Sequence, residues 1–120
     1  MSNLLSDYKH FRVFEADLIT TYGDDLINAK ADKRETVYCT DVVTAIKKFR
    51  KGETTQDMLL DWVNTLWFCD GLFIYDESQC DSIASVMTEL ETLDEDGVAY
   101  TNDEFDRMVA ALEQNIEYVR

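Results

Sequence analysis

The stretch Met58-Leu59-Leu60-Asp61-Trp62-Val63-Asn64-Thr65-Leu66-Trp67-Phe68-Cys69 decides the fold of this 120-residue chain. Most of its apolar side chains recur at helical spacing and form one wide stripe. Thr54 followed by Asp57 approximates a capping box, which marks the place where a helix begins. We therefore expect this segment to be the central helix, against which the other elements pack.

The residues before this stretch predict further helices. Apolar side chains recur at mostly helical spacing over residues 3–22, which predicts one long helix, and the polar segment 24–34 predicts a short helix or a loop. A helix over residues 42–49 should end at Lys47-Lys48-Phe49-Arg50-Lys51-Gly52. There the cations lie at the negative end of the helix dipole, and the glycine supplies the cap.

Two more helices are predicted after the central one. Asp76 with Gln79 marks the start of a helix whose inward side chains are Cys80, Ile83, Ala84, Met87 and Leu90. Thr101 with Glu104 is a capping box for a last helix, whose inward side chains are Phe105, Met108, Val109, Leu112, Ile116 and Val119. Leu72-Phe73-Ile74-Tyr75 has strand propensity, but a lone strand has nothing to pair with. We expect it to be buried connecting chain.

The predicted fold class is all-α. Four main helices plus a short one, short connections and no proline favour a single-domain antiparallel helical bundle over residues 1–120. A chain of this length falls in the usual size range of one domain. Apolar residues make up 46% of it, which is enough for a core despite the high charge.

The charge is distributed unevenly. The chain has a net charge of −14, and the 55 residues between Lys51 and Arg107 contain fifteen carboxylates but no Lys, Arg or His. Residues 1–69 carry 11 acidic and 9 basic side chains, net −2, whereas residues 70–120 carry 14 acidic and 2 basic side chains, net −12. Such a field attracts a basic partner and repels nucleic acid and anionic lipid.

Ten of these carboxylates are predicted to gather on the last two helices and their connection, and we call them the acidic ridge. They are Glu77, Asp81, Glu89, Asp94, Glu95, Asp96, Asp103, Asp106, Glu113 and Glu117. A solvated face that keeps the protein soluble would look similar. However, interspersed lysines would serve solubility and also form stabilising helix pairs, so their absence favours a binding surface for a basic protein.

The connection between these helices also permits a calcium hypothesis. With Gly97 at position six of an EF-hand-like loop, Asp94 and Asp96 occupy positions three and five. Position one is Thr92, and Glu104 comes one place too late for the bidentate ligand. We therefore expect no metal and no cofactor, and we take Gly97 as the end of a helix.

Catalytic motifs are weak in this sequence. His10 is the only histidine, and no nucleophile motif lies beside it. Cys39, Cys69 and Cys80 lack metal-ligand spacing, and acidic surroundings suppress thiolate formation. We expect no enzymatic activity, and reduced, buried thiols.

One resemblance to a known family is visible. Phe49-Arg50-Lys51-Gly52-Glu53-Thr54, followed by Asp61-Trp62 and an acidic pair of C-terminal helices, resembles small helical immunity proteins of bacterial toxin systems. It covers roughly residues 45–112 and transfers no individual functional residue. The resemblance implies an acidic helical protein that occludes a basic toxin, often a nuclease.

Three functions follow from these observations. The first is a non-enzymatic inhibitor of a basic partner, either as a toxin immunity protein or as a phage-encoded, anti-CRISPR-like mimic that blocks a host nucleic-acid enzyme. The second is an adaptor subunit with an apolar interface at Leu60, Trp67 and residues 72–75. The third is a calcium sensor. We expect a cytoplasmic protein that is monomeric or weakly self-associating, because the sequence shows no signal core and no apolar run long enough to span a bilayer. Its negative charge argues against direct binding to nucleic acid or to anionic membranes.

Overall fold

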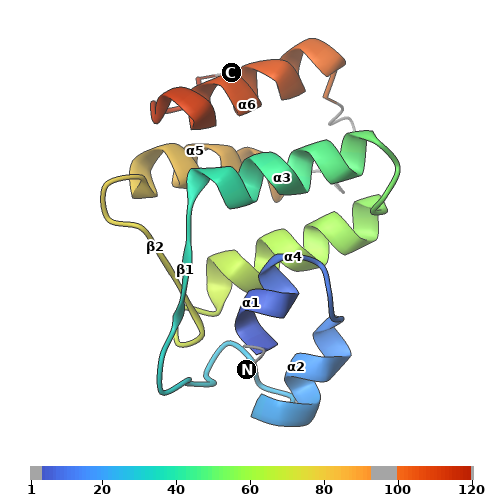
Figure 1. Cartoon of the computed structure of the whole chain (residues 1–120), viewed down its shortest axis with the longest axis vertical. Helices are drawn as coiled ribbons and strands as arrows, with labels where there is room; N and C mark the ends of the chain where they lie inside the picture. The colour runs from blue at the N-terminus through green and yellow to red at the C-terminus, as the bar shows by residue number, and fades with distance from the viewer. Residues whose placement is uncertain (1–3, 93–99, 120) are drawn as a thin grey trace.

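The computed structural model describes residues 4–92 and 100–119 of the chain. These residues form six helices and one small sheet (Figure 1). In chain order the elements are α1 (Leu4–Lys9), α2 (Glu15–Tyr22), β1 (Glu35–Val37), α3 (Cys39–Arg50), α4 (Gln56–Phe68), β2 (Phe73–Tyr75), α5 (Cys80–Leu90) and α6 (Asn102–Gln114). The fold is therefore mostly helical, as expected, but it also contains strands.

The expected single helix over residues 3–22 is wrong, because the chain turns sharply between α1 and α2. Phe11 adopts a left-handed conformation with φ of 62°, and the amides of Phe11 and Arg12 donate to the carbonyls of Tyr8 and Asp7. This pattern closes the C-terminus of α1 as a Schellman motif, which usually has glycine at the left-handed position. The Phe11 ring stacks on Trp62 at 5.4 Å between centroids, and this contact holds the turn against its strain.

The expectation that Leu72–Tyr75 has no strand partner is also wrong. β2 pairs in parallel with β1, and Thr36 lies opposite Ile74 in the register. The connection between the two strands contains α3 and α4. Residues 35–38, Glu-Thr-Val-Tyr, have strand propensity of their own, but a three-residue strand becomes apparent only when its distant partner is known. Residues 24–34, which precede β1, contain no helix.

The ends of α3 and α4 follow local capping rules. Lys47, Lys48 and Arg50 lie in the last turn of α3, and Gly52 follows with φ of 77°, as the sequence predicts. The N-cap of α4 is Thr55, whose hydroxyl accepts from the amide of Met58, rather than Thr54. The predicted start of the central helix is therefore displaced by one residue, and Thr54 is buried instead.

The last two helices differ from the prediction at two of their ends, the start of α5 and the end of α6. α5 begins at Cys80 and not at Asp76, because residues 76–79 form a turn closed by the Gln79 amide and the Asp76 carbonyl. Thr101 and Glu104 form the predicted capping box of α6. α6 ends at Gln114, and Asn115 takes a left-handed conformation with φ of 53°. Ile116 and Val119 are therefore exposed and not inward-facing, and the Gly97 connection lies outside the described residues.

One buried ion cluster joins α1, β1 and α3. Lys9 is 5% exposed, and its ammonium lies 2.7 Å from a Glu35 carboxylate oxygen and 3.1 Å from an Asp41 oxygen. The same ammonium donates to the backbone carbonyl of Thr36. Burial alone would lower the pKa of Lys9, but the two carboxylates raise it above its ordinary value. The backbone carbonyl of Lys9 accepts from the indole of Trp62, so the cluster also holds α4.

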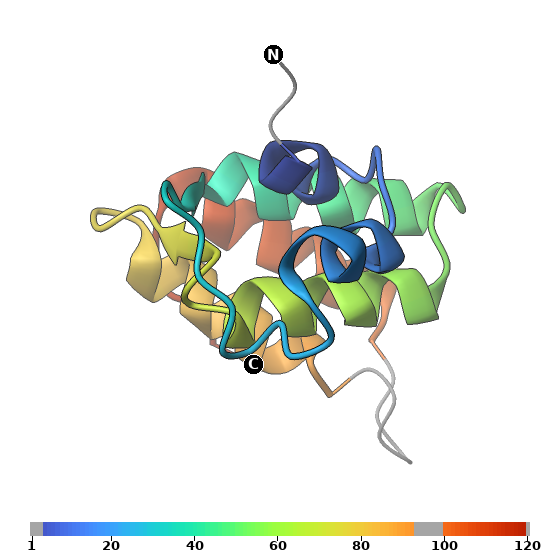
Figure 2. The same cartoon turned by 90° about the horizontal axis from the view of Figure 1, so that it is seen from below.

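The buried apolar side chains of the described residues form one connected core. Trp62, Leu59 and Leu66 of α4 are fully buried within it, as expected of a central helix. In Figure 1, α6 lies at one end of the longest axis and α2 lies toward the other end, with α3, α4 and α5 between them. Seen from below, α1, α2 and α4 face the viewer (Figure 2). Along its longest axis the molecule therefore has α6 at one end and α2 toward the other.

Candidate functional site

The acidic ridge is only partly assembled as a helical surface. Asp81 is exposed in the first turn of α5, and Asp103, Asp106 and Glu113 share the exposed side of α6. Glu77 is exposed in the turn before α5. Asp94, Glu95 and Asp96 lie outside the described residues, as does most of the hypothesised calcium loop.

Three members of the ridge depart from the expected arrangement. Glu117 lies beyond the end of α6, so it does not continue the helical flank of Glu113. Glu89 is half-buried and accepts a hydrogen bond from the Tyr100 hydroxyl. Asp106 forms an ion pair with Arg50, with 2.6 Å between the nitrogen and the oxygen. The described part of the ridge that remains open to a partner consists of Glu77, Asp81, Asp103, Glu113 and Glu117.

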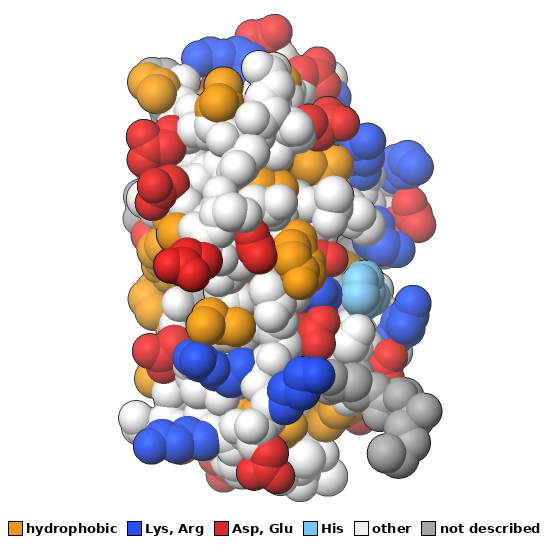
Figure 3. Space-filling model, turned by 60° about the vertical axis from the view of Figure 1, so that its left-hand side comes forward, with side chains coloured by type: hydrophobic (Ala, Val, Ile, Leu, Met, Phe, Trp, Pro, Cys, Tyr) orange, Lys and Arg blue, Asp and Glu red, His pale blue; other side chains and the backbone are white. Residues whose placement is uncertain are grey.

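Charge is segregated on the surface as well as along the sequence. On the face shown in Figure 3, acidic side chains predominate along the upper left, whereas basic side chains gather on the right and in the lower part. Within residues 70–119, Arg107 is the only basic residue, and it donates to the carbonyl of Val119. Among the described residues, no group of three or more His, Cys, Asp and Glu side chains could hold a metal ion.

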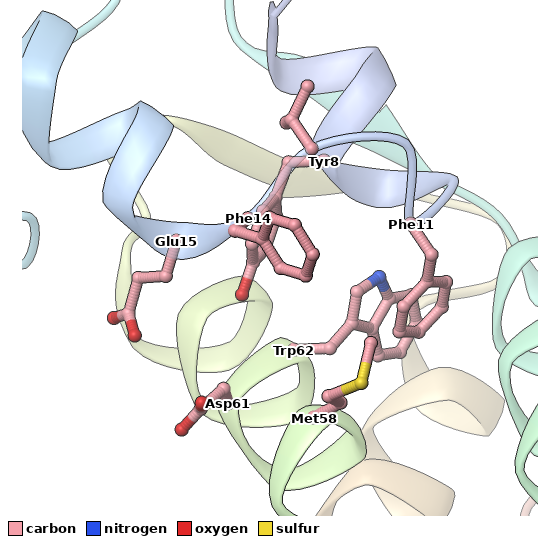
Figure 4. Close-up of a pocket in the computed structure, with 8 residues that line it drawn as sticks. Tyr8, Phe11, Phe14, Glu15, Met58, Asp61 and Trp62 are labelled. Carbon is pink, nitrogen blue, oxygen red and sulfur yellow. The ribbon is translucent and has the colours of Figure 1, made fainter. Parts of the chain in front are cut away.

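A second surface, not anticipated from the sequence, is a groove between α2 and α4. Its first hollow, of about 50 Å³, is lined by Tyr8, Phe11, Val13, Phe14, Glu15, Met58, Asp61 and Trp62. In Figure 4 the Glu15 and Asp61 side chains lie on one side of this hollow, and the Phe11 and Trp62 rings lie on the other. The second hollow, of about 240 Å³, is lined by Glu15, Ile19, Asp24, Asp25, Leu26, Ile27, Asn64, Thr65, Phe68 and Cys69. Glu15 lines both hollows, so they adjoin at this residue, and together we call them the α2–α4 groove.

Carboxylates line this groove without a described basic side chain among them. Glu15, Asp24, Asp25 and Asp61 contribute to its walls. Burial and the Asp61 carboxylate raise the pKa of Glu15 above its ordinary value. Burial and the nearby carboxylates, Glu15 foremost, also raise the pKa of the Cys69 thiol to about 11. The groove is thus an electronegative environment in which negative charge is already destabilised.

Large apolar side chains are exposed along the same groove. Phe14, Ile27 and Phe68 are 69%, 61% and 50% exposed, respectively. Scattered single apolar residues are normal on a protein surface, but three large ones on a single groove are a feature of binding sites. The sequence alone did not reveal this, because Phe14 fits the helical spacing of residues 3–22 and suggests a core position.

The apolar interface predicted for an adaptor is in the core instead. Leu60, Leu72 and Phe73 are buried, at 7%, 0% and 2% exposure. Trp67 is half-buried and stacks on Tyr75 at 5.7 Å between centroids. Most of this predicted surface is therefore covered, although Ile74 is 39% exposed, and larger exposed fractions occur in the α2–α4 groove.

His10 has polar neighbours, but they do not form a catalytic triad. Its Nε2 lies 3.6 Å from an Asp41 oxygen, and its Nδ1 lies 3.4 Å from the Ser6 hydroxyl. The same Nδ1 lies 2.8 Å from the Ser6 backbone carbonyl, which can only accept a hydrogen bond. A nitrogen that donates to this carbonyl cannot take the hydroxyl proton, so the contact does not activate Ser6.

The three cysteines are free thiols. Cys39 and Cys69 are buried, as predicted, whereas Cys80 is half-buried and directs its thiol toward the Glu77 carbonyl. The raised pKa of Cys69 keeps its thiol protonated at neutral pH. The buried Cys69 thiol is therefore not suited to be a nucleophile.

Comparisons with family models, with curated proteins and with solved structures yield no match for this chain. In the described parts of the chain, every helix is too short or too polar to cross a bilayer. The functional interpretation therefore depends on the two surfaces described above.

Proposed function

We propose that this protein is a non-enzymatic acidic inhibitor that occludes the basic surface of a protein partner. The observation that carries the proposal is the net charge of −12 in residues 70–120, with exposed carboxylates on α5 and α6. Carboxylates spaced along helices mimic the phosphates of a nucleic acid, so a nucleic-acid enzyme is the natural target. An immunity protein against a nuclease toxin fits this description best.

The proposed scaffold is an antiparallel bundle of α3, α4, α5 and α6. Its support is that α3 packs against α6 and that α4 packs against α5, with the buried face of each helix turned toward the common core. In such a bundle the outer sides of α5 and α6 present the ridge to solvent. The protein would act by covering its partner's active site and would need no chemistry of its own.

A salt-dependent association rate tests this function. The tagged protein is used to capture its partner from the native host, and the association rate of the purified pair is then measured at increasing salt. Electrostatic steering makes this rate fall steeply as salt rises. A rate that stays constant across the salt series would refute the proposal.

A matched pair of double variants assigns the effect to the ridge. Asp103→Asn with Glu113→Gln removes two charges from α6, and Asp32→Asn with Asp57→Asn removes two exposed charges elsewhere. Both double variants change the net charge equally, and Asp103 and Asp57 each lie in the first turn of a helix. The ridge variant should associate more slowly than the control variant. Equal rates would show that only total charge matters.

A partner that is a phage target rather than a toxin would give the same kinetics. The two forms of the proposal are distinguished by the captured protein itself. A nuclease toxin supports immunity, whereas a host nucleic-acid enzyme supports the phage inhibitor. Both outcomes are consistent with the inhibitory mechanism.

A further inference from the structure

We propose that the α2–α4 groove binds an amphipathic helical segment, rich in Lys and Arg, of a protein partner. α2, which contributes one wall of the groove, lies toward the opposite end of the molecule from α6 (Figure 1), and no residue of the acidic ridge lines the groove. It would give the protein a second contact surface with its own specificity. The ridge could fail its test and the groove could still bind, and the reverse is equally possible.

The length and shape of the groove suit a short helix. Its α4 wall contains Met58, Asp61, Trp62, Asn64, Thr65 and Phe68, followed by the C-cap residue Cys69. Met58 and Cys69 are eleven positions apart, which corresponds to roughly 17 Å at 1.5 Å per residue. A partner helix of about three turns would match this length.

The apolar content of the groove provides contacts for such a segment. Phe14 lines the first hollow and Phe68 the second, so each hollow has an exposed aromatic ring in its wall. Phe14 and Phe68 are at least half exposed in the isolated chain. An amphipathic helix places apolar side chains at intervals of three and four residues, which allows it to cover both rings.

The charges of the groove specify a basic occupant. Glu15 belongs to both hollows, and its charged form is disfavoured by burial and by Asp61. A lysine or arginine placed between these two carboxylates would relieve the repulsion and form charge-assisted hydrogen bonds. Binding of a cation beside Glu15 and Asp61 should therefore be more favourable than its binding beside an isolated surface carboxylate.

Other occupants are disfavoured by the same charges. A second copy of this chain carries a net charge of −14 and would bring further carboxylates to the groove. Nucleic acids and anionic membranes are repelled in the same way. Charge complementarity thus leaves a basic, amphipathic protein segment as the fitting partner.

A designed peptide tests the groove directly. The probe is a fluorescein-labelled Leu/Lys peptide of about 12 residues with amphipathic helical spacing. The controls are a peptide of the same composition in an order that is not amphipathic, and a Leu/Glu peptide with the original spacing. Fluorescence anisotropy should show binding of the amphipathic Leu/Lys peptide that exceeds that of both controls.

Four protein variants locate the binding. Phe68→Ser and Glu15→Gln alter the groove, whereas Ile116→Ser and Glu113→Gln make the same kinds of change at exposed positions outside it. Phe68 and Ile116 are similarly exposed, at 50% and 52%, so both serine variants should retain the fold, which thermal unfolding verifies. Each groove variant should weaken binding by about tenfold, the usual cost of removing a central contact, while the controls should stay within about twofold.

Several results would overturn the proposal. Equal binding of the amphipathic and reordered Leu/Lys peptides would indicate attraction by net charge alone. Equal losses in the groove and control variants would place the site elsewhere. Sedimentation that shows a dimer abolished by Phe68→Ser would identify a second copy of the chain as the occupant.

Discussion

Carboxylates have opposite effects in two regions of this molecule. Around Lys9, Glu35 and Asp41 pair with a buried ammonium and hold α1, β1 and α3 together. In the α2–α4 groove, Glu15 and Asp61 lie on the same side of the first hollow and repel each other, and none of the lining residues that the structure describes is basic. The first region uses negative charge to stabilise the fold, whereas the second maintains negative charge at a cost in stability. A cost of this kind is typical of surfaces retained for function.

The largest expected loss of stability follows from removing the ammonium of Lys9. Lys9→Met leaves two carboxylates in a buried environment without their counter-ion, so it should destabilise the protein by about 3–5 kcal/mol. Urea unfolding monitored by circular dichroism measures the loss. Lys47→Met, at an exposed position in the last turn of α3, is the control and should cost less than about 0.5 kcal/mol. Similar losses in both variants would show that the Lys9 cluster does not hold the fold.

A smaller loss is expected when one carboxylate of this cluster is neutralised. Asp41 accepts from the amide of Tyr38 as well as from Lys9, and a neutral amide side chain lacks the negative charge that strengthens both contacts. Asp41→Asn should therefore cost about 1.5–3 kcal/mol, the range for hydrogen bonds to charged groups. The control is Asp106→Asn, which breaks the more exposed pair with Arg50 and should cost about 0.2–1 kcal/mol. A larger loss of stability in Asp106→Asn than in Asp41→Asn would show that burial does not strengthen the Lys9 ion pairs.

In the groove, neutralising a carboxylate should stabilise the protein rather than destabilise it. Glu15→Gln removes a charge disfavoured by burial and by Asp61, and should stabilise the protein by a few tenths of a kcal/mol, since solvent screens a partly exposed group. Asp61→Asn should act in the same direction. The stability gained by the double variant should be smaller than the sum of the two single gains, because either change alone removes the repulsion. Additive effects in this cycle would indicate that the two carboxylates do not interact.

The smallest expected effect is the pH dependence of the stability that Glu15→Gln adds. The folded-state pKa of Glu15 lies above its ordinary value of 4.5, so the wild-type protein binds this proton more strongly when folded. The stabilising contribution of protonated Glu15 is therefore complete below pH 4.5 and is lost as the pH rises through the folded-state pKa. The melting-temperature difference between Glu15→Gln and wild type should thus be greatest near neutral pH and should diminish toward pH 4. A difference that is constant with pH would contradict the assignment to Glu15.

Local signals were sufficient for much of the helical structure. The capping box of Thr101 and Glu104, the basic last turn of α3 and the central helix are all found where the sequence predicts them. These features depend on residues within one or two turns of each other, and hydrophobic periodicity and capping report them directly. The helix break at Phe11 was not visible, because it depends on a ring contact with Trp62, 51 positions later in the chain.

The sheet and the groove illustrate the same distinction. β1 and β2 are three-residue segments separated by two helices, and each becomes a strand through its pairing with the other. The groove unites Phe14 of the α1–α2 connection, Ile27 of the loop after α2 and Phe68 of α4. Periodicity assigns apolar residues to faces of single helices and cannot show which of those faces remain uncovered.

The sequence by itself determined the charge of this protein and its helical character. Net charge is a sum over residues, and helix formation depends on neighbours in the chain, so neither requires knowledge of distant contacts. Only the tertiary structure decided where the carboxylates act. It placed Glu35 and Asp41 against a buried ammonium, left Glu15 beside Asp61 in an apolar groove, and ended α6 before Glu117. The energy of a charge depends on its burial and on its neighbours in space, and folding alone sets both of these.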